Sequence, residues 1–369
     1  MLPLDISRNP TEITVAASYQ QIMEALAKRH LSEESSIEDL IELRYSVLSV
    51  VCPDKLRGRV WKLLLLLPNV SASCYINIVH RGPSSVDTKI RNDTFRTMTT
   101  DTSFLEHVSE DMLIRVLNAF VWISRKGEHT DDTSEEIQLR QYFQSLSSSS
   151  KELTYVQGMN ILAAPFLMVM PEMEAFYSFS TFLWRWCPLY VHPTLKGVHC
   201  GVRLVDLCLA ALDPTLYGYL LGKGLTASIY AFPSVLSFSA CTPPLSELLQ
   251  LWDVMFAFGA HLNILYIIAQ IGMVRHELLH SSSPMKILRK LPPLQAKTII
   301  TIAMIFCKKL PMDLYEKLVR HAYDESVADE LGVKVVADSD QPQNDVSGLP
   351  DYMTEAMGIS TKSFYEPRN

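Results

Sequence analysis

The chain has 369 residues, of which 48% are hydrophobic, enough to bury the core of one large domain or two smaller ones. Its formal net charge of −7 leaves no broad basic surface for phosphates, which argues against general nucleic-acid binding and against membrane docking through basic residues. Its seven cysteines are scattered and never spaced as C-x-x-C, which is typical of a reducing compartment, and we expect a cytoplasmic protein.

Helical periodicity dominates the chain and predicts an all-α fold. The N-terminus, MLPLDISRNP, lacks the apolar region of a signal peptide. We expect residues 1–45 to form an N-terminal helical extension, residues 46–324 the main domain, and the polar, aperiodic residues 325–369 a flexible tail. Apolar residues recur with helical spacing at Tyr19, Ile22, Met23 and Leu26, and again at Leu113, Val116, Leu117, Phe120 and Val121.

Two polar stretches predict loops, residues 127–136 (GEHTDDTSEE) and residues 145–150 (SLSSSS). Further on, residues 254–274 (VMFAFGAHLNILYIIAQIGMV) are mostly apolar and about long enough to cross a bilayer. Because Gly259 interrupts this stretch and His261, Asn263 and Gln270 are spread along it, we predict a buried core helix and no membrane span.

Four short motifs follow one another along the chain. The first, L-R-G-R-V-W, places Arg57 four residues before Trp61, so that both side chains share one face of a helix. The last is a W-D element that ends in Asp253. Between them lie I-x-x-D-x-x-R, with Ile90, Asp93 and Arg96, and Y-x-Q-G-M-N, with Tyr155, Gln157 and Asn160.

In this order, the four motifs resemble the fingerprint of the TBC domain, an all-helical family of Rab GTPase-activating proteins. The resemblance covers roughly residues 46–324. It implies that Arg96 and Gln157 act as two catalytic fingers on a Ras- or Rab-like small GTPase and that Asp93 holds Arg96 in place. It implies supporting roles for Arg57, Trp61, Tyr155, Asn160 and Asp253.

The chemistry of GTP hydrolysis explains why these two residue types are needed. Its loose transition state spreads negative charge over the phosphoryl oxygens, and an arginine inserted by a second protein neutralises that charge. A glutamine carboxamide can accept a hydrogen bond from the attacking water and donate one to the phosphate. No cofactor is expected on this chain, because the partner GTPase carries GTP and Mg²⁺.

The sequence departs from the broad family pattern before the W-D element. There, residues 225–233 (LTASIYAFP) replace the usual tryptophan-rich segment, and no S-P-Y-type segment follows the glutamine motif. Four segments instead resemble the branch of the family that acts in fungal septation and the spindle-position checkpoint: residues 187–190, 223–230, 239–247 and 261–270.

The resemblance to this branch implies a catalytic subunit that works with a scaffold subunit as a two-component activator, inhibits septation and mitotic exit, and is recruited to the spindle pole body. An alternative is a non-catalytic module of the same shape that binds a GTPase or a checkpoint partner. The presence of both finger residues, Arg96 and Gln157, favours activity.

A second alternative rests on residues 276–280 (HELLH), which match H-E-x-x-H, the signature that places two zinc-binding imidazoles and a general base on one helix face. A catalytic zinc ion needs a third protein ligand, yet Ser281 to Pro284 end the helix and the next glutamate is Glu316. We therefore expect a helix end with solvated histidines. The spacing of His192, His199, Cys200 and Cys208 fits no zinc pattern.

Overall fold

The computed structural model describes residues 37–67, 70–125, 131–147 and 153–334, and every regular element within these ranges is helical. The prediction of an all-α fold is confirmed. The predicted helix around Tyr19 to Leu26 lies outside the described residues, as does the part of the predicted tail 325–369 that begins at residue 335.

The helices of the first half of the chain begin with α2. They are α2 (Ile37–Ser49), α3 (Asp54–Leu64), α4 (Ala72–His80), α5 (Asp87–Thr94), α6 (Thr102–His107), α7 (Glu110–Ser124), α8 (Ser134–Leu146), α9 (Met159–Val169) and α10 (Glu172–Thr181), followed by a π-helical turn η1 (Phe182–Trp186) and a 3₁₀ turn η2 (Pro188–Tyr190).

The helices of the second half begin with the long helix α11. They are α11 (Lys196–Leu212), α12 (Pro214–Gly222), α13 (Ala227–Tyr230), α14 (Phe232–Leu236), α15 (Leu245–Phe258), α16 (Leu262–Met273), α17 (Arg275–His280), α18 (Pro284–Leu288), α19 (Ala296–Lys309), α20 (Met312–Arg320) and α21 (Ser326–Glu330).

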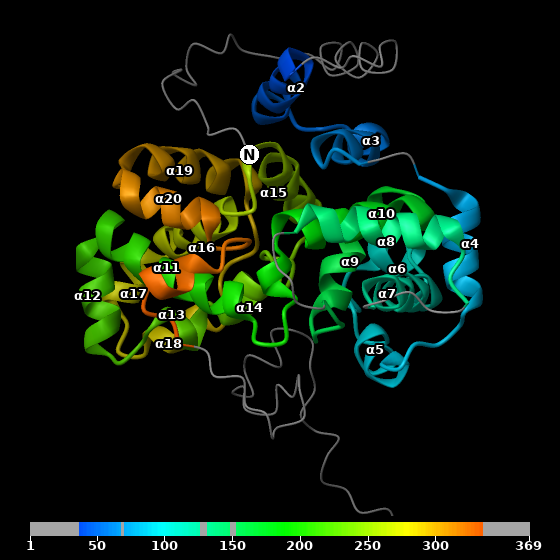
Figure 1. The fold of residues 1–369 in the computed structure, drawn as a ribbon. Coiled ribbons are helices and arrows are strands. Elements are labelled where there is room, and N and C mark those ends of the chain that lie inside the picture. The colour runs from blue at the N-terminus through cyan, green and yellow to red at the C-terminus, as the bar shows by residue number, and fades with distance from the viewer. Residues whose placement is uncertain (1–36, 68–69, 126–130, 148–152, 335–369) are drawn as a thin grey trace, which may run out of the picture.

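The helices form two groups that lie side by side (Figure 1). In the first group α7 and α10 pack on each other and on α9, while α5 packs on α7. In the second group α11 and α16 pack together, and α19 covers α16. Helix α3 contacts α9 of the first group and α15 of the second, and α2 packs on α15. The motif on α3 therefore lies where the two groups meet.

A cluster of aromatic rings fills the core at this junction. Trp61 of α3 lies 4.8 Å from Phe256 of α15 and 5.5 Å from Phe166 of α9, measured between ring centroids. Phe182 and Trp252 complete the cluster, and all five side chains are fully buried. Edge-to-face pairs of this kind add about 0.5–1.5 kcal/mol each beyond their buried area, so these rings stabilise the contact between the two groups.

The apolar stretch of residues 254–274 does not form the single core helix that we predicted. It contains the end of α15 and all of α16, separated by a turn at Gly259. The backbone of Gly259 has φ 135°, a conformation that residues with a Cβ rarely adopt, and this glycine ends α15. Both helices are buried. Within the part of the chain that the structure describes, none of the helices combines the length and the apolar character needed to span a bilayer.

Each of the two loops predicted from the sequence overlaps helix α8. The predicted loop 127–136 overlaps α8, because Thr133 and Glu136 form a reciprocal capping box that starts this helix at Ser134. The predicted loop 145–150 overlaps the end of the same helix, which runs to Leu146.

Beyond residue 324, the boundary that we predicted for the main domain, α21 packs against α11 and buries Val327.

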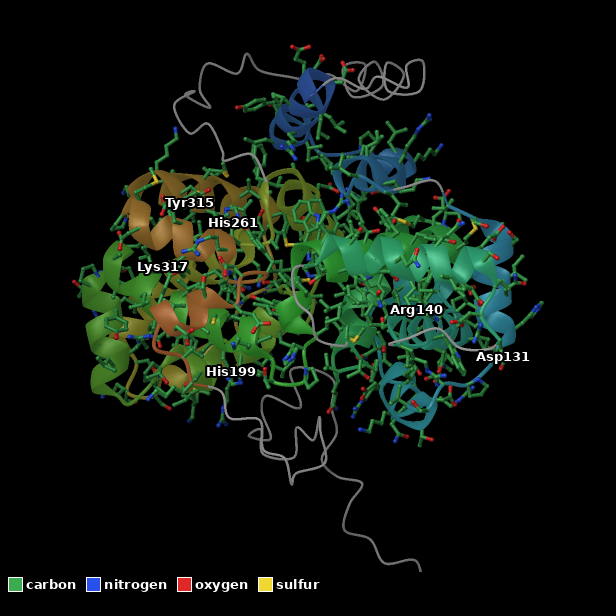
Figure 2. All side chains as sticks on the ribbon, viewed as in Figure 1. Asp131, Arg140, His199, His261, Tyr315 and Lys317 are labelled. Atoms are coloured by element: carbon green, nitrogen blue, oxygen red, sulfur yellow. The ribbon has the colours of Figure 1, made fainter. Side chains whose placement is uncertain are left out.

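Helix α20 is attached to α16 through a buried histidine. His261, at the start of α16, lies with its Nε2 3.2 Å from the hydroxyl oxygen of Tyr315 on α20, and Figure 2 shows the two side chains close together. Burial lowers the pKa of His261 to about 3, and the nearby His321 acts in the same direction. The imidazole is therefore neutral at physiological pH and packs as part of the core.

Candidate functional site

The carboxylate of Asp93 is the centre of the candidate site. Asp93 lies near the end of α5 and is buried, with 4% of its surface exposed. Arg96 follows α5 in the next turn, and its Nη2 donates a hydrogen bond to Asp93 Oδ1 at 2.5 Å. The i, i+3 spacing of the motif brings the two side chains together, and a cation is favourable beside the C-terminal end of a helix. Asp93 therefore fixes the direction of the Arg96 side chain.

Gln157 reaches the same carboxylate from a segment far away in the sequence. It lies in the turn before α9, where Gly158 takes the left-handed conformation with φ 99°. The Nε2 of Gln157 lies 3.4 Å from Asp93 Oδ1, and the hydroxyl of Tyr155 donates to Asp93 Oδ2 at 2.6 Å. One aspartate thus orients Arg96 and Gln157, the two residues that the sequence predicted as fingers.

The backbone around Asp93 is held in place by two further polar side chains. Thr97 donates a hydrogen bond from Oγ1 to the carbonyl oxygen of Asp93 at 3.1 Å. Asn160, in the first turn of α9, donates from Nδ2 to Thr97 Oγ1 at 2.9 Å and lies 3.3 Å from the same carbonyl. All three residues are buried. These hydrogen bonds join the end of α5 to the start of α9. They therefore fix the segment that carries Arg96 relative to the segment that carries Gln157.

The buried phenol of Tyr155 supports this arrangement electrostatically. Burial raises the pKa of Tyr155 well above its usual value, and the charge of Asp93 raises it further. Tyr155 therefore stays protonated, and its hydroxyl donates a hydrogen bond to the carboxylate. Because Asp93 also has Arg96 and Gln157 around it, its negative charge is compensated on several sides.

Arg96 and Gln157 keep hydrogen-bonding capacity for a partner. Arg96 exposes 17% of its side chain. Within residues 37–334, as far as these are described, its Nε and Nη1 and the carboxamide oxygen of Gln157 have no hydrogen-bond partner. The pair can therefore offer a forked cationic donor and a carboxamide to a negatively charged group without first breaking other contacts.

Phe95 is a neighbour of this site that the sequence motifs did not single out. It precedes Arg96, exposes 63% of its surface and has its ring 5.9 Å from the Arg96 guanidinium carbon. A lone phenylalanine next to a helical pattern normally indicates a core position. Only the structure reveals that this ring is on the surface beside Arg96.

The other three predicted supporting residues, Arg57, Trp61 and Asp253, come together in a separate cluster between α3 and α15. The Nε of Arg57 lies 3.0 and 3.1 Å from the two carboxylate oxygens of Asp253, and Trp61 Nε1 donates to Asp253 Oδ1 at 2.7 Å. The side chains of Arg57 and Asp253 are each only 3% exposed. Arg57 also contacts Asp54 and donates to the carbonyl oxygen of Cys52 at 2.8 Å. This cluster joins the two helix groups.

Asp253 is charged in this cluster although it is buried. Burial raises its pKa to about 6, and the raising effect is opposed by Arg57 and Trp61. At pH 7 the carboxylate is therefore mostly ionised and compensates the Arg57 cation.

We expect Asp253→Asn to lower the free energy of unfolding by about 3–5 kcal/mol, because the buried Arg57 would lose its buried counter-ion and keep only the exposed Asp54. Asp54→Asn is the matched control, since Asp54 contacts the same guanidinium but is 92% exposed on its side chain; it should cost about 0–1 kcal/mol. Urea unfolding monitored by circular dichroism measures both effects. Equal effects of the two substitutions would contradict a structural role for the Arg57 and Asp253 pair.

The H-E-x-x-H motif forms the short helix α17, which does not resemble a metal site. His276, Glu277 and His280 are exposed, the two imidazoles stack with centroids 4.2 Å apart, and His280 Nδ1 lies 2.8 Å from the His276 carbonyl oxygen. Elsewhere, His199 packs edge-on against Phe232. Among the described residues no group of three His, Cys, Asp or Glu side chains could hold a metal ion, so the zinc alternative has no structural support.

Comparisons with known proteins identify the family of this chain. The Rab-GTPase-TBC domain family matches residues 54–279. Cell division control protein 16 of Schizosaccharomyces pombe is 44% identical over 311 residues, which cover 82% of this chain and 94% of that protein. The mitotic check point protein BUB2 of Saccharomyces cerevisiae is 36% identical over 316 residues, covering 79% of this chain and 99% of the relative.

The fold is also found among solved structures. The crystal structure of the Ypt/Rab-GAP domain of Gyp1p superposes with a TM-score of 0.55 at 15% sequence identity, over 77% of this chain and 98% of that one. This likeness concerns the fold. Together with the four ordered motifs and the extent of the family match, it leads to one conclusion: the chain belongs to the Rab-GTPase-TBC domain family.

Proposed function

We propose that this protein is a GTPase-activating protein that inserts Arg96 and Gln157 into the nucleotide site of a Ras- or Rab-like small GTPase. The observation that carries the proposal is the shared carboxylate of Asp93, which lies within hydrogen-bonding distance of both side chains. Family membership supports the activity itself.

Each finger has a distinct part in the proposed mechanism. The Arg96 guanidinium places two donors against the phosphoryl oxygens, where negative charge develops in the transition state. The Gln157 carboxamide accepts a hydrogen bond from the attacking water through its oxygen and donates to the phosphate through its nitrogen. Because Asp93, Tyr155 and Asn160 already fix the two segments, little reorganisation is needed when the GTPase docks.

The GTPase brings its own GTP and Mg²⁺ to this site. A guanidinium and a carboxamide fit the transferring phosphoryl group, since both carry N–H donors and neither needs a metal ion on this chain. We therefore propose that this protein contributes no cofactor and changes the rate only through the side chains that it inserts.

We further propose that the protein acts in a mitotic checkpoint that controls septation; its relatives include a cell division control protein and a mitotic check point protein. The same proposal includes a scaffold subunit and recruitment of a cytoplasmic protein to the spindle pole body. It is supported by residues 187–190, 223–230, 239–247 and 261–270, which resemble the checkpoint branch, and by residues 225–233, which stand where the broad family has a tryptophan-rich segment.

We expect the chain alone to stimulate GTP hydrolysis weakly and the scaffold subunit to raise the stimulated rate about 10²-fold or more, because holding the GTPase against the site increases its effective concentration. The measurement is single-turnover hydrolysis by a panel of Ras- and Rab-like GTPases, with and without the scaffold. Saturating stimulation by the chain alone would contradict the two-component proposal but leave the finger chemistry intact.

A further inference from the structure

An apolar cavity of about 440 Å³ opens between α2, α3, η1 and α20. Its volume lies in the range of about 300–1,000 Å³ that is usual for ligand pockets. The walls are mostly apolar and come from four separate elements, so the cavity is a feature of the assembled domain. The residues that form these walls include Leu40, Ile41, Leu64, Trp186, Val319 and Ala322.

Two arginines give this apolar cavity a positive charge. Arg44 of α2 lines it, and the Nε of Arg44 is buried without a hydrogen-bond partner among the described residues. Arg185 of η1 lines it too, and its Nη1 donates to the carbonyl oxygens of Leu65 at 3.0 Å and Leu66 at 3.5 Å. Burial lowers the pKa of Arg44, as expected for a cation without a counter-ion. The cavity is therefore suited to a carboxylate flanked by apolar groups.

The chain itself contains a segment with this chemistry. Residues 335–369 carry six acidic residues against two basic ones. Within them, residues 349–357 (LPDYMTEAM) combine Asp351 and Glu355 with one leucine, one tyrosine and two methionines and contain no basic residue. The segment before α2 is less suitable, because residues 1–36 carry five acidic and three basic residues.

The chain runs from the lining of the cavity to this segment. Tyr323, in the turn after α20, lines the cavity, and it is followed by α21 and by Lys334, which is eleven residues further on. From Lys334 to Leu349 the chain can span at most about 50–54 Å when extended. Such tethering gives the segment a high effective concentration at any site within that reach.

We propose that residues 349–357 dock in this cavity, with a carboxylate of Asp351 or Glu355 against Arg44 and with the apolar side chains of the segment against Leu40 and Val319. The tail then covers the apolar surface between α2 and α20 and supplies the counter-ion that Arg44 lacks within the described residues. This inference does not depend on the proposed GTPase-activating function.

Hydrogen–deuterium exchange of the full-length protein, analysed by mass spectrometry, tests the proposal. We expect amides of residues 349–357 to exchange at least about fivefold more slowly in the natural protein than in Arg44→Glu, because docking protects them. Lys290→Glu, the same charge reversal at an exposed site after α18, should leave this protection unchanged. The double substitution Asp351→Arg and Glu355→Arg should abolish the protection, and combining it with Arg44→Glu should restore it.

Several outcomes would overturn the proposal. Unprotected amides in residues 349–357 of the natural protein would do so, as would protection that Arg44→Glu and the double substitution both leave intact. Arg44-dependent protection of residues 1–36 instead would identify the N-terminal segment as the occupant. Protection that appears only at high protein concentration would point to a second copy of the chain. Loss of protection in Arg44→Glu through unfolding of α2 is distinguished by the charge-reversal rescue.

Discussion

Replacing Arg96 by alanine is expected to lower the stimulated rate of GTP hydrolysis by about 10³- to 10⁵-fold, the usual contribution of an arginine finger. The reason is that the guanidinium acts on charge that develops in the transition state, so its removal affects the rate more than the binding of the GTPase. Arg96→Lys should be nearly as damaging, because an ammonium group cannot reproduce the planar pair of donors.

The matched control for Arg96 is Arg91→Ala. Arg91 lies on α5, pairs with Asp87 and exposes 53% of its side chain, so its removal should leave the stimulated rate unchanged. Single-turnover hydrolysis at several concentrations of activator separates the maximal rate from apparent affinity. Full stimulation by Arg96→Ala would show that Arg96 is not a finger.

The second large effect is expected at Gln157. If this residue supplies the carboxamide that positions water, stimulation should persist on a GTPase whose own catalytic glutamine has been changed to leucine. Gln157→Ala should then lower the stimulated rate on that GTPase about 10²- to 10³-fold, the usual cost of removing one transition-state hydrogen bond.

Gln144→Ala is the matched control, because Gln144 is an exposed glutamine on α8, away from the Asp93 contacts. It should leave the rate unchanged on both GTPases. If the leucine substitution in the GTPase alone abolished stimulation while Gln157→Ala had no effect, the GTPase would supply the glutamine and the two-finger mechanism would be wrong.

The sequence predicted the local part of the site well. The resemblance to the TBC family implied that Asp93 holds Arg96 in place, and it assigned the roles of Arg96 and Gln157. Spacing could not show that Gln157 approaches the same carboxylate, because this contact joins positions 64 residues apart. Likewise, the contact between Arg57 and Asp253 spans 196 residues and depends on the packing of α3 against α15.

The errors in the predicted fold have local physical causes. The stretch 254–274 was predicted as one helix because its composition is mostly apolar, yet the conformation of Gly259 ends α15. Residues 134–136 were assigned to a loop because they are polar, but Thr133 and Glu136 form the cap that starts α8. The exposure of Phe95 depends on the turn after α5, about which the sequence pattern says nothing.

The central claim is that Arg96 and Gln157 act on the transition state of GTP hydrolysis, and one binding measurement tests it directly. The affinity of the protein for the GDP-bound GTPase is measured with and without aluminium fluoride, which mimics the transferring phosphoryl group. The mechanism predicts a complex that tightens at least about 10²-fold with aluminium fluoride, and this gain is lost in Arg96→Ala and Gln157→Ala. An affinity that is the same with and without aluminium fluoride, and unchanged in both variants, would contradict the claim and identify the protein as a non-catalytic GTPase-binding module.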